Sequence, residues 1–163
     1  MALAALVTWV ITAGLGFFML ATWVSGGGTG GGASTASHFR PPVVFAHFLL
    51  AAAGLVVWVV YLAADSQALA WVAFVDLLVV ALIGDTLVYR WFKDRQGGAR
   101  GPADTGVSRP DGTGSAATKT GSATTAEPAL AEQRIPPAVV AAHGVFAVTT
   151  VVLVLLVALG VGG

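Results

Sequence analysis

Four long apolar segments constrain this chain more than any other feature of the sequence. They cover residues 2–24, 42–63, 68–92 and 137–161, and charged side chains interrupt only the third of them. A helix rises about 1.5 Å per residue, so roughly 20 residues are needed to cross the hydrocarbon core of a bilayer. Each segment reaches that length. We therefore expect an all-α, polytopic membrane protein that folds as a four-helix transmembrane bundle.

The composition agrees with this interpretation and excludes several kinds of protein. Of the 163 residues, 56% are hydrophobic and only 10% are charged, whereas soluble domains carry about 25% charged residues. This composition predicts contact with a lipid bilayer. The formal net charge is zero, so the sequence does not predict a nucleic-acid partner. The chain has no cysteine, which excludes disulfides, thiolate metal sites, iron–sulfur clusters and covalently attached haem.

Two polar linkers and one short loop join the apolar segments. Residues 25–37 are rich in Gly, Ser and Thr, and residues 94–133 combine small residues with scattered charges. Such a composition cannot bury enough apolar surface to fold, so we expect the linker at 94–133 to be disordered. With the short loop at 64–67, the chain divides into a first hairpin, residues 1–63, and a second hairpin, residues 64–163.

The basic residues predict the topology. All eight Lys and Arg lie in or beside the two linkers, and none lies in the loop at 64–67 or near either end of the chain. By the positive-inside rule, both linkers are cytoplasmic and both termini are outside. Segment 2–24 has no Lys or Arg before it and no Ala-x-Ala site closing it. We therefore interpret it as a retained span and not as a signal peptide.

An internal repeat links the two hairpins. The second and fourth segments both begin with Pro-x-Val-Val-x-Ala-His, at Pro41–His47 and at Pro137–His143. The first and third segments share a Gly and a Trp at equal spacing, at Gly16–Trp23 and at Gly84–Trp91. Two hairpins of two spans keep the same orientation in the membrane. We therefore expect two parallel two-helix hairpin repeats, related by an axis along the membrane normal.

The repeat places two histidines at equal depth. His47 and His143 each lie six residues inside their segment, which corresponds to about 9 Å along a helix. The symmetry of the repeat puts them on equivalent helix faces near the cytoplasmic side. The next side chains on the same faces are small, which leaves room for a close helix neighbour or for a flat ligand. These small residues are Ala51, Gly54, Ala147 and Thr150.

Two hypotheses account for the histidine pair. Imidazole is a standard axial ligand of haem iron, so His47 and His143 are candidate ligands of a haem b between two spans. Alternatively, each imidazole hydrogen-bonds a neighbouring helix, or serves another metal or a proton-transfer role. The sequence does not decide between these hypotheses, and the identity of any metal stays open.

The third segment carries the only intramembrane carboxylates. Asp76 lies near the bilayer midplane, where a charged carboxylate costs about 2.5–3.5 kcal/mol, so it should be protonated, hydrogen-bonded or directed into a polar cavity. Thr8, its repeat equivalent, is a candidate partner. Asp85 lies on nearly the opposite helix face and either orients a histidine through a hydrogen bond or pairs with Lys93. Both carboxylates are candidates for a proton relay, and we expect His38, just after the first linker, to be solvated.

Several short motifs in the second to fourth segments carry a resemblance. They are Ala46-His47-Phe48-Leu49-Leu50, Gly54-Leu55-Val56-Val57-Trp58, Ala142-His143-Gly144 and Leu153-Val154-Leu155-Leu156. With these motifs the chain resembles uncharacterised four-span integral membrane proteins of actinobacteria. The resemblance implies a protein of the bacterial plasma (inner) membrane, and it implies no activity.

Three classes of function remain open. The first is a small b-type haem-binding or electron-transfer subunit that uses His47 and His143. The second is a small transporter or ion-coupled protein, working as a homodimer, in which Asp76 and Asp85 line a polar path with the histidines. The third is an accessory subunit of a larger membrane complex. The sequence contains no Ser/His/Asp or metalloprotease arrangement and therefore gives no indication of an enzyme.

Overall fold

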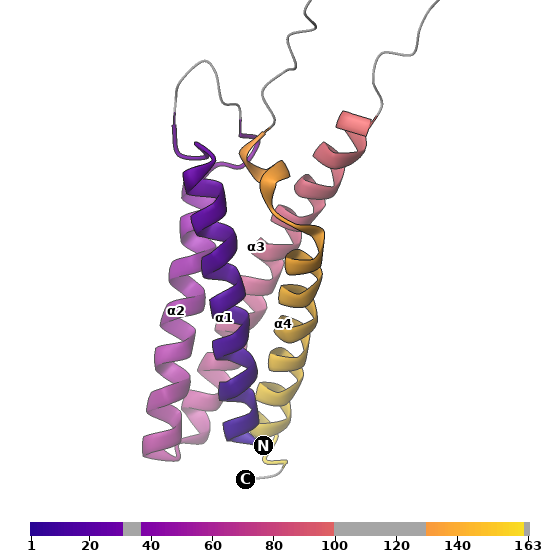
Figure 1. Ribbon diagram of the computed structural model, residues 1–163. Coiled ribbons are helices and arrows are strands. Elements are labelled where there is room, and N and C mark those ends of the chain that lie inside the picture. The colour runs from indigo at the N-terminus through magenta and orange to yellow at the C-terminus, as the bar shows by residue number, and fades with distance from the viewer. Residues whose placement is uncertain (31–36, 100–129, 162–163) are drawn as a thin grey trace, which may run out of the picture.

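The computed structural model describes residues 1–30, 37–99 and 130–161. In chain order the helices are α1 (Ala2–Ser25), α2 (Pro41–Ala64), α3 (Gln67–Ala99), the short 3-10 helix η1 (Ala131–Arg134) and α4 (Pro137–Ala158). The four α-helices are each long and apolar enough to cross a membrane. They pack together as a bundle (Figure 1), which confirms the all-α, four-span fold predicted from the sequence.

The ends of α2 and α4 follow from local sequence. Pro41 and Pro137 lie in the first turns of α2 and α4, where the missing N–H of proline leaves no hydrogen bond unmade. The tight connection from α2 to α3 uses Asp65, whose left-handed conformation (φ 48°) lets its N–H donate to the carbonyl of Tyr61 at 2.8 Å. This connection makes α2 and α3 antiparallel neighbours.

The second linker is shorter than the sequence indicated. α3 continues to Ala99, past the expected end of the third span at residue 92, and η1 precedes α4. Asp94 and Glu132, which we expected in a disordered linker at 94–133, therefore belong to α3 and η1. Residues 100–129 of that linker, and residues 31–36 of the first linker, lie outside the described residues.

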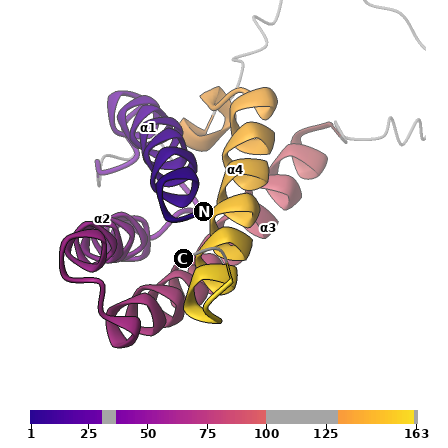
Figure 2. The ribbon, with the colours of Figure 1, turned by 90° about the horizontal axis from the view of Figure 1, so that it is seen from below.

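The four helices form a ring in the order α1, α2, α3, α4 (Figure 2). α1 packs most extensively on α4, and α2 on α3. Within the described residues, the opposite pairs α1/α3 and α2/α4 make no close backbone approach. The most extensive interfaces therefore join a helix from the first half of the chain to a helix from the second half.

Two buried clusters lie toward opposite ends of the bundle. One packs around Trp9, Trp58 and Leu77, near the chain termini. The other packs around Trp23 and Trp91, at the end that carries the linkers. Between them lies a stretch of each helix that contributes to neither cluster. We call these four stretches the middle level; they are residues 10–18, 45–54, 78–86 and 141–150.

The outer surface of the bundle is apolar. Large aliphatic side chains on different helices are strongly exposed, among them Leu3 (71%), Leu82 (67%) and Val145 (66%). Exposed apolar surface on this scale is unfavourable in water and suits contact with lipid tails, while the helices satisfy their own backbone hydrogen bonds. The bundle therefore has the surface of a protein that lies in a bilayer.

Candidate functional site

The middle level of the bundle brings His47 and His143 together. Their ring centres lie 6.4 Å apart with the ring planes tilted by 55°. His47 lies on α2 and His143 on α4, which occupy opposite corners of the ring of helices. Both side chains therefore point inward across the bundle. This contact supports the sequence prediction that the two histidines lie at equal depth on equivalent faces.

A backbone carbonyl holds each imidazole. Nδ1 of His47 lies 3.0 Å from the carbonyl oxygen of Val80 on α3, and Nδ1 of His143 lies 3.0 Å from that of Thr12 on α1. Because a carbonyl oxygen can only accept, each Nδ1 must carry the proton and donate it. In the neutral imidazole Nε2 of each ring is then the unprotonated nitrogen. Within the described residues neither Nε2 makes a hydrogen bond, so both lone pairs are free to bind a ligand.

A glycine accommodates each imidazole ring. A Cβ atom on Gly84 would lie 3.0 Å from Cε1 of His47, and one on Gly16 would lie 3.2 Å from Cε1 of His143. Each glycine stands four residues after the residue whose carbonyl accepts from that ring, one turn along the same helix. The same arrangement of carbonyl, glycine and histidine therefore occurs twice, once between α2 and α3 and once between α4 and α1.

The small residues predicted around the histidines lie at the level expected. Ala51 and Ala147 are partly buried. Gly54 and Thr150 are buried, at the end of the middle level next to the cluster near the chain termini. None of these four residues belongs to either apolar cluster. These small residues therefore lie in the same stretches of α2 and α4 as the histidines, while the tryptophans of the two clusters lie above and below.

Asp76 is partly buried and makes no hydrogen bond with any residue that the structure describes. Its carboxylate packs against Gly54 on α2, in the space that a side chain at that position would need. In the described part of the chain, Oδ2 of Asp76 is buried and unpartnered. Thr8, the partner that the sequence suggested, instead accepts a hydrogen bond from the Thr150 hydroxyl at 2.9 Å. Asp76 is therefore neither paired with Thr8 nor in contact with the histidines by hydrogen bonding.

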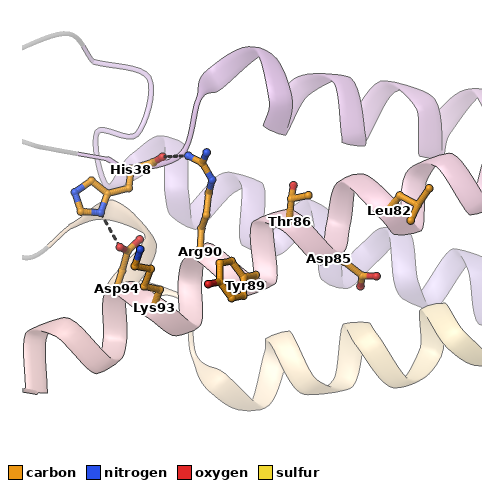
Figure 3. A pocket seen from close by; sticks show the side chains of 8 residues that line it. All are labelled: His38, Leu82, Asp85, Thr86, Tyr89, Arg90, Lys93 and Asp94. Carbon is orange, nitrogen blue, oxygen red and sulfur yellow. Dashed lines mark hydrogen bonds and ion pairs between the residues drawn. The ribbon is translucent and has the colours of Figure 1, made fainter.

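Asp85 lies on the surface and does not orient either histidine. It lines an open groove beside α3 (Figure 3), and its side chain is exposed. Within the described residues it makes no hydrogen bond or ion pair, either with a histidine or with Lys93. The backbone carbonyls of Val80 and Thr12 perform the orienting role that the sequence suggested for this carboxylate.

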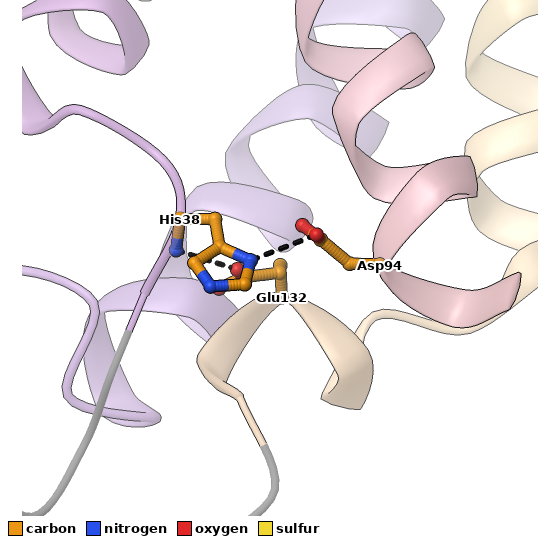
Figure 4. Close-up of side chains that lie close together, drawn as sticks. All are labelled: His38, Asp94 and Glu132. Atoms are coloured by element: carbon orange, nitrogen blue, oxygen red, sulfur yellow. Dashed lines mark hydrogen bonds and ion pairs between the residues drawn. The ribbon is translucent and has the colours of Figure 1, made fainter. Parts of the chain in front are cut away.

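A second polar cluster lies at the linker end of the bundle, and the sequence did not predict it. Nδ1 of His38 lies 2.7 Å from Oδ1 of Asp94, and the backbone N–H of His38 donates to Oε1 of Glu132 at 2.7 Å (Figure 4). His38 was expected to be solvated; its side chain is 57% exposed but engaged with Asp94. The apolar residues Leu130 and Ile135 on either side of η1 are the signal that could have indicated an ordered segment before α4.

The four spans make this chain a multi-pass membrane protein. Neither a protein-family model, nor a curated protein, nor a solved structure matches it.

Proposed function

We propose that this chain is a small b-type haem-binding subunit of a bacterial plasma membrane, with His47 and His143 as the two axial ligands. The observation that carries the proposal is the pair of imidazoles 6.4 Å apart, each with Nδ1 bound to a carbonyl. A hydrogen bond at one ring nitrogen fixes the tautomer and makes the other nitrogen a better metal ligand. The donor set therefore suits haem iron.

The separation of the rings supports one shared metal. A histidine nitrogen binds a metal ion at about 2 Å, and the centre of an imidazole ring lies roughly 1 Å behind that nitrogen. Two imidazoles on opposite sides of one ion therefore have ring centres about 6 Å apart. The centres of His47 and His143 lie 6.4 Å apart, so one ion could be shared with little movement of either helix.

The glycines support the ligand role of the histidines. Gly16 and Gly84 leave the space that the rings of His143 and His47 occupy, so each ring is held in place beside a neighbouring helix. The apolar clusters on either side of the middle level would exclude water from the ligand.

Haem bound at this site would supply a one-electron carrier inside the membrane. The chain's own residues would hold it, fix its orientation through two backbone carbonyls and shield it from water. We place the site nearer the cytoplasmic side, because His47 and His143 lie early in α2 and α4, and the basic residues Arg40 and Arg134 precede these helices at the end of the bundle away from the N-terminus (Figure 1). The equivalent contacts of the two histidines also support an internal repeat of two parallel hairpins.

The absorption spectrum of the detergent-purified protein, expressed with a haem precursor and then reduced with dithionite, tests this proposal. We expect a Soret band with sharp α and β bands, and we expect His47→Ala and His143→Ala each to abolish it. His38→Ala is the matched control, because His38 lies outside the middle level and should not affect the spectrum. Absence of haem bands despite adequate haem supply, or retention of them in both middle-level variants, would overturn the proposal.

Asp76 favours a second candidate function, proton or ion coupling. Its buried Oδ2 has no partner within the described residues, and unpaired intramembrane carboxylates commonly mark ion or proton pathways. A four-span chain would have to work as a homodimer or within a larger membrane complex to enclose such a pathway. In proteoliposomes, Asp76→Asn should abolish proton flux if this function is present. Equal flux in wild type and variant would exclude it.

A further inference from the structure

We propose that His38, Asp94 and Glu132 bind a divalent transition-metal ion at the linker end of the bundle. The three residues come from three separate segments: the residues before α2, the last part of α3, and η1. Each offers one ligand atom, and these atoms all lie within 4.8 Å of one another. Figure 4 shows the imidazole and the two carboxylates gathered at one point. The site is separate from the histidine pair and does not depend on the function proposed above.

The strongest argument is that two buried carboxylate oxygens have no partner among the described residues. Glu132 is completely buried (0% exposed), and the side chain of Asp94 is 13% exposed. Oε2 of Glu132 and Oδ2 of Asp94 are buried without a hydrogen-bond partner in the described part of the chain. A buried carboxylate is strongly unfavourable unless a cation or several hydrogen bonds compensate it. Two of them side by side also repel each other, and His38, which pairs with Asp94, can balance at most one of the two charges. A divalent cation would therefore stabilise the cluster.

The neighbouring arginines do not supply that cation. Arg95 donates to the carbonyls of Gln133 and Ile135, at 3.1 and 3.0 Å, and its guanidinium lies over the Trp91 ring. Arg90 donates to the carbonyl of His38 at 3.2 Å. Within the described residues neither arginine forms an ion pair with a carboxylate. Both instead fix the backbone segments that carry His38 and Glu132.

The geometry suits adjacent ligands of one ion. Ligands about 2 Å from a metal ion and on neighbouring coordination positions lie roughly 3 Å apart. Nδ1 of His38 and Oδ1 of Asp94 are separated by 2.7 Å, so a metal ion would replace the proton that these two atoms share. The backbone N–H of His38 holds Oε1 of Glu132, which fixes the carboxylate and leaves Oε2 unpartnered beside it. A small adjustment of these side chains would therefore place all three on one ion.

The donor set indicates the kind of ion. Imidazole nitrogen suits zinc, iron, nickel and copper, carboxylate oxygen suits manganese and the harder ions, and one nitrogen with two oxygens matches zinc, manganese or ferrous iron best. Magnesium and calcium prefer oxygen ligands alone. The exposed side of His38 leaves room for water as a further ligand. Bound metal would tie the chain before α2 and the chain before α4 to the end of α3.

Equilibrium dialysis of Zn²⁺ against the full-length, untagged protein in detergent tests the site. We expect one high-affinity Zn²⁺ per chain, with Mg²⁺ unable to compete for it. His38→Ala and Glu132→Gln should each weaken Zn²⁺ binding by roughly tenfold or more. Asp85→Asn is the matched control, because this carboxylate lines the same groove as Asp94 but lies outside the cluster; this variant should bind Zn²⁺ as wild type does.

Two results would overturn the proposal. One is the absence of stoichiometric Zn²⁺ binding by the wild-type protein. The other is unchanged Zn²⁺ affinity in His38→Ala, which alone decides the matter if Glu132→Gln does not fold, because the His38 side chain is 57% exposed. Zinc binding that is lost in His47→Ala but kept in His38→Ala would also contradict the proposal, since it would assign the metal to the histidine pair.

Discussion

The ring centres of His47 and His143 lie 6.4 Å apart, although the two residues belong to helices at opposite corners of the bundle. Each ring points into the bundle at the middle level, where a neighbouring helix provides a carbonyl that binds the ring and a glycine that makes room for it. The positions of both rings are therefore fixed by helix backbone. A pair held in this way is already arranged for a ligand, which lowers the cost of binding.

Gly84→Ala should displace the imidazole of His47. The added Cβ would lie 3.0 Å from Cε1 of that ring, and the ring cannot retreat without losing its hydrogen bond to Val80. Overpacking of this kind costs typically 1–3 kcal/mol. We expect a loss of stability of about that size relative to a glycine-to-alanine change in open space, measured by unfolding in mixed micelles, together with less haem bound per chain.

Gly14→Ala is the matched control for this prediction. A Cβ on Gly14 meets no atom within 4 Å, so the change adds only the helix preference of alanine, which is about 1 kcal/mol in favour of the fold. Equal stability and equal haem content in the Gly14 and Gly84 variants would show that the glycine is not needed beside His47.

Thr150→Val should destabilise the interface between α1 and α4. Thr150 is 1% exposed, and its hydroxyl lies 2.9 Å from that of Thr8 and 2.8 Å from the carbonyl of Phe146 in its own helix. Valine has nearly the same shape, so the loss should be that of hydrogen bonding alone, about 0.5–1.5 kcal/mol. Thr149→Val is the control: Thr149 is exposed and bonds only the carbonyl of Val145 in its own helix. A smaller loss of stability in Thr150→Val than in Thr149→Val would contradict the hydrogen bond between Thr150 and Thr8.

Gly54→Ala should be destabilising because of Asp76. A Cβ on Gly54 would overlap the Asp76 carboxylate and would lie 3.0 Å from Cζ2 of Trp9. If the carboxylate is the main obstacle, Asp76→Ala should relieve much of the cost. We expect a coupling energy of about 0.5–3 kcal/mol between the two changes in a double-mutant cycle. Additive effects would instead assign the obstruction to Trp9.

The sequence was sufficient for the spans and for the depth of the histidines. Unbroken apolar length identified each span, and the motif that runs from Pro41 to His47, repeated from Pro137 to His143, set both histidines at one level. The helices, however, are apolar on every face, so hydropathy did not indicate which face of each helix points inward. The sequence showed the matching positions of Gly16 and Gly84. It did not show that each glycine contacts a histidine from the other half of the chain.

The polar residues were harder to place. Asp85 was assigned by depth alone, and depth does not distinguish a lipid-exposed or groove-facing side chain from one that reaches the histidines. Asp94 and Glu132 lie at the two ends of a linker with the composition of a disordered segment. Their burial depends on contacts between α3, η1 and His38, which are far apart in the sequence. Composition does not reveal such contacts.

Electron paramagnetic resonance of the oxidised, haem-loaded protein tests the central claim most directly, because it reports the axial ligands of the iron. We predict a low-spin ferric signal characteristic of two imidazole ligands in the wild type. It should be lost or replaced by a high-spin signal in His143→Ala and unchanged in His38→Ala. A high-spin wild-type signal, or a low-spin signal that survives in His143→Ala, would contradict ligation by His47 and His143.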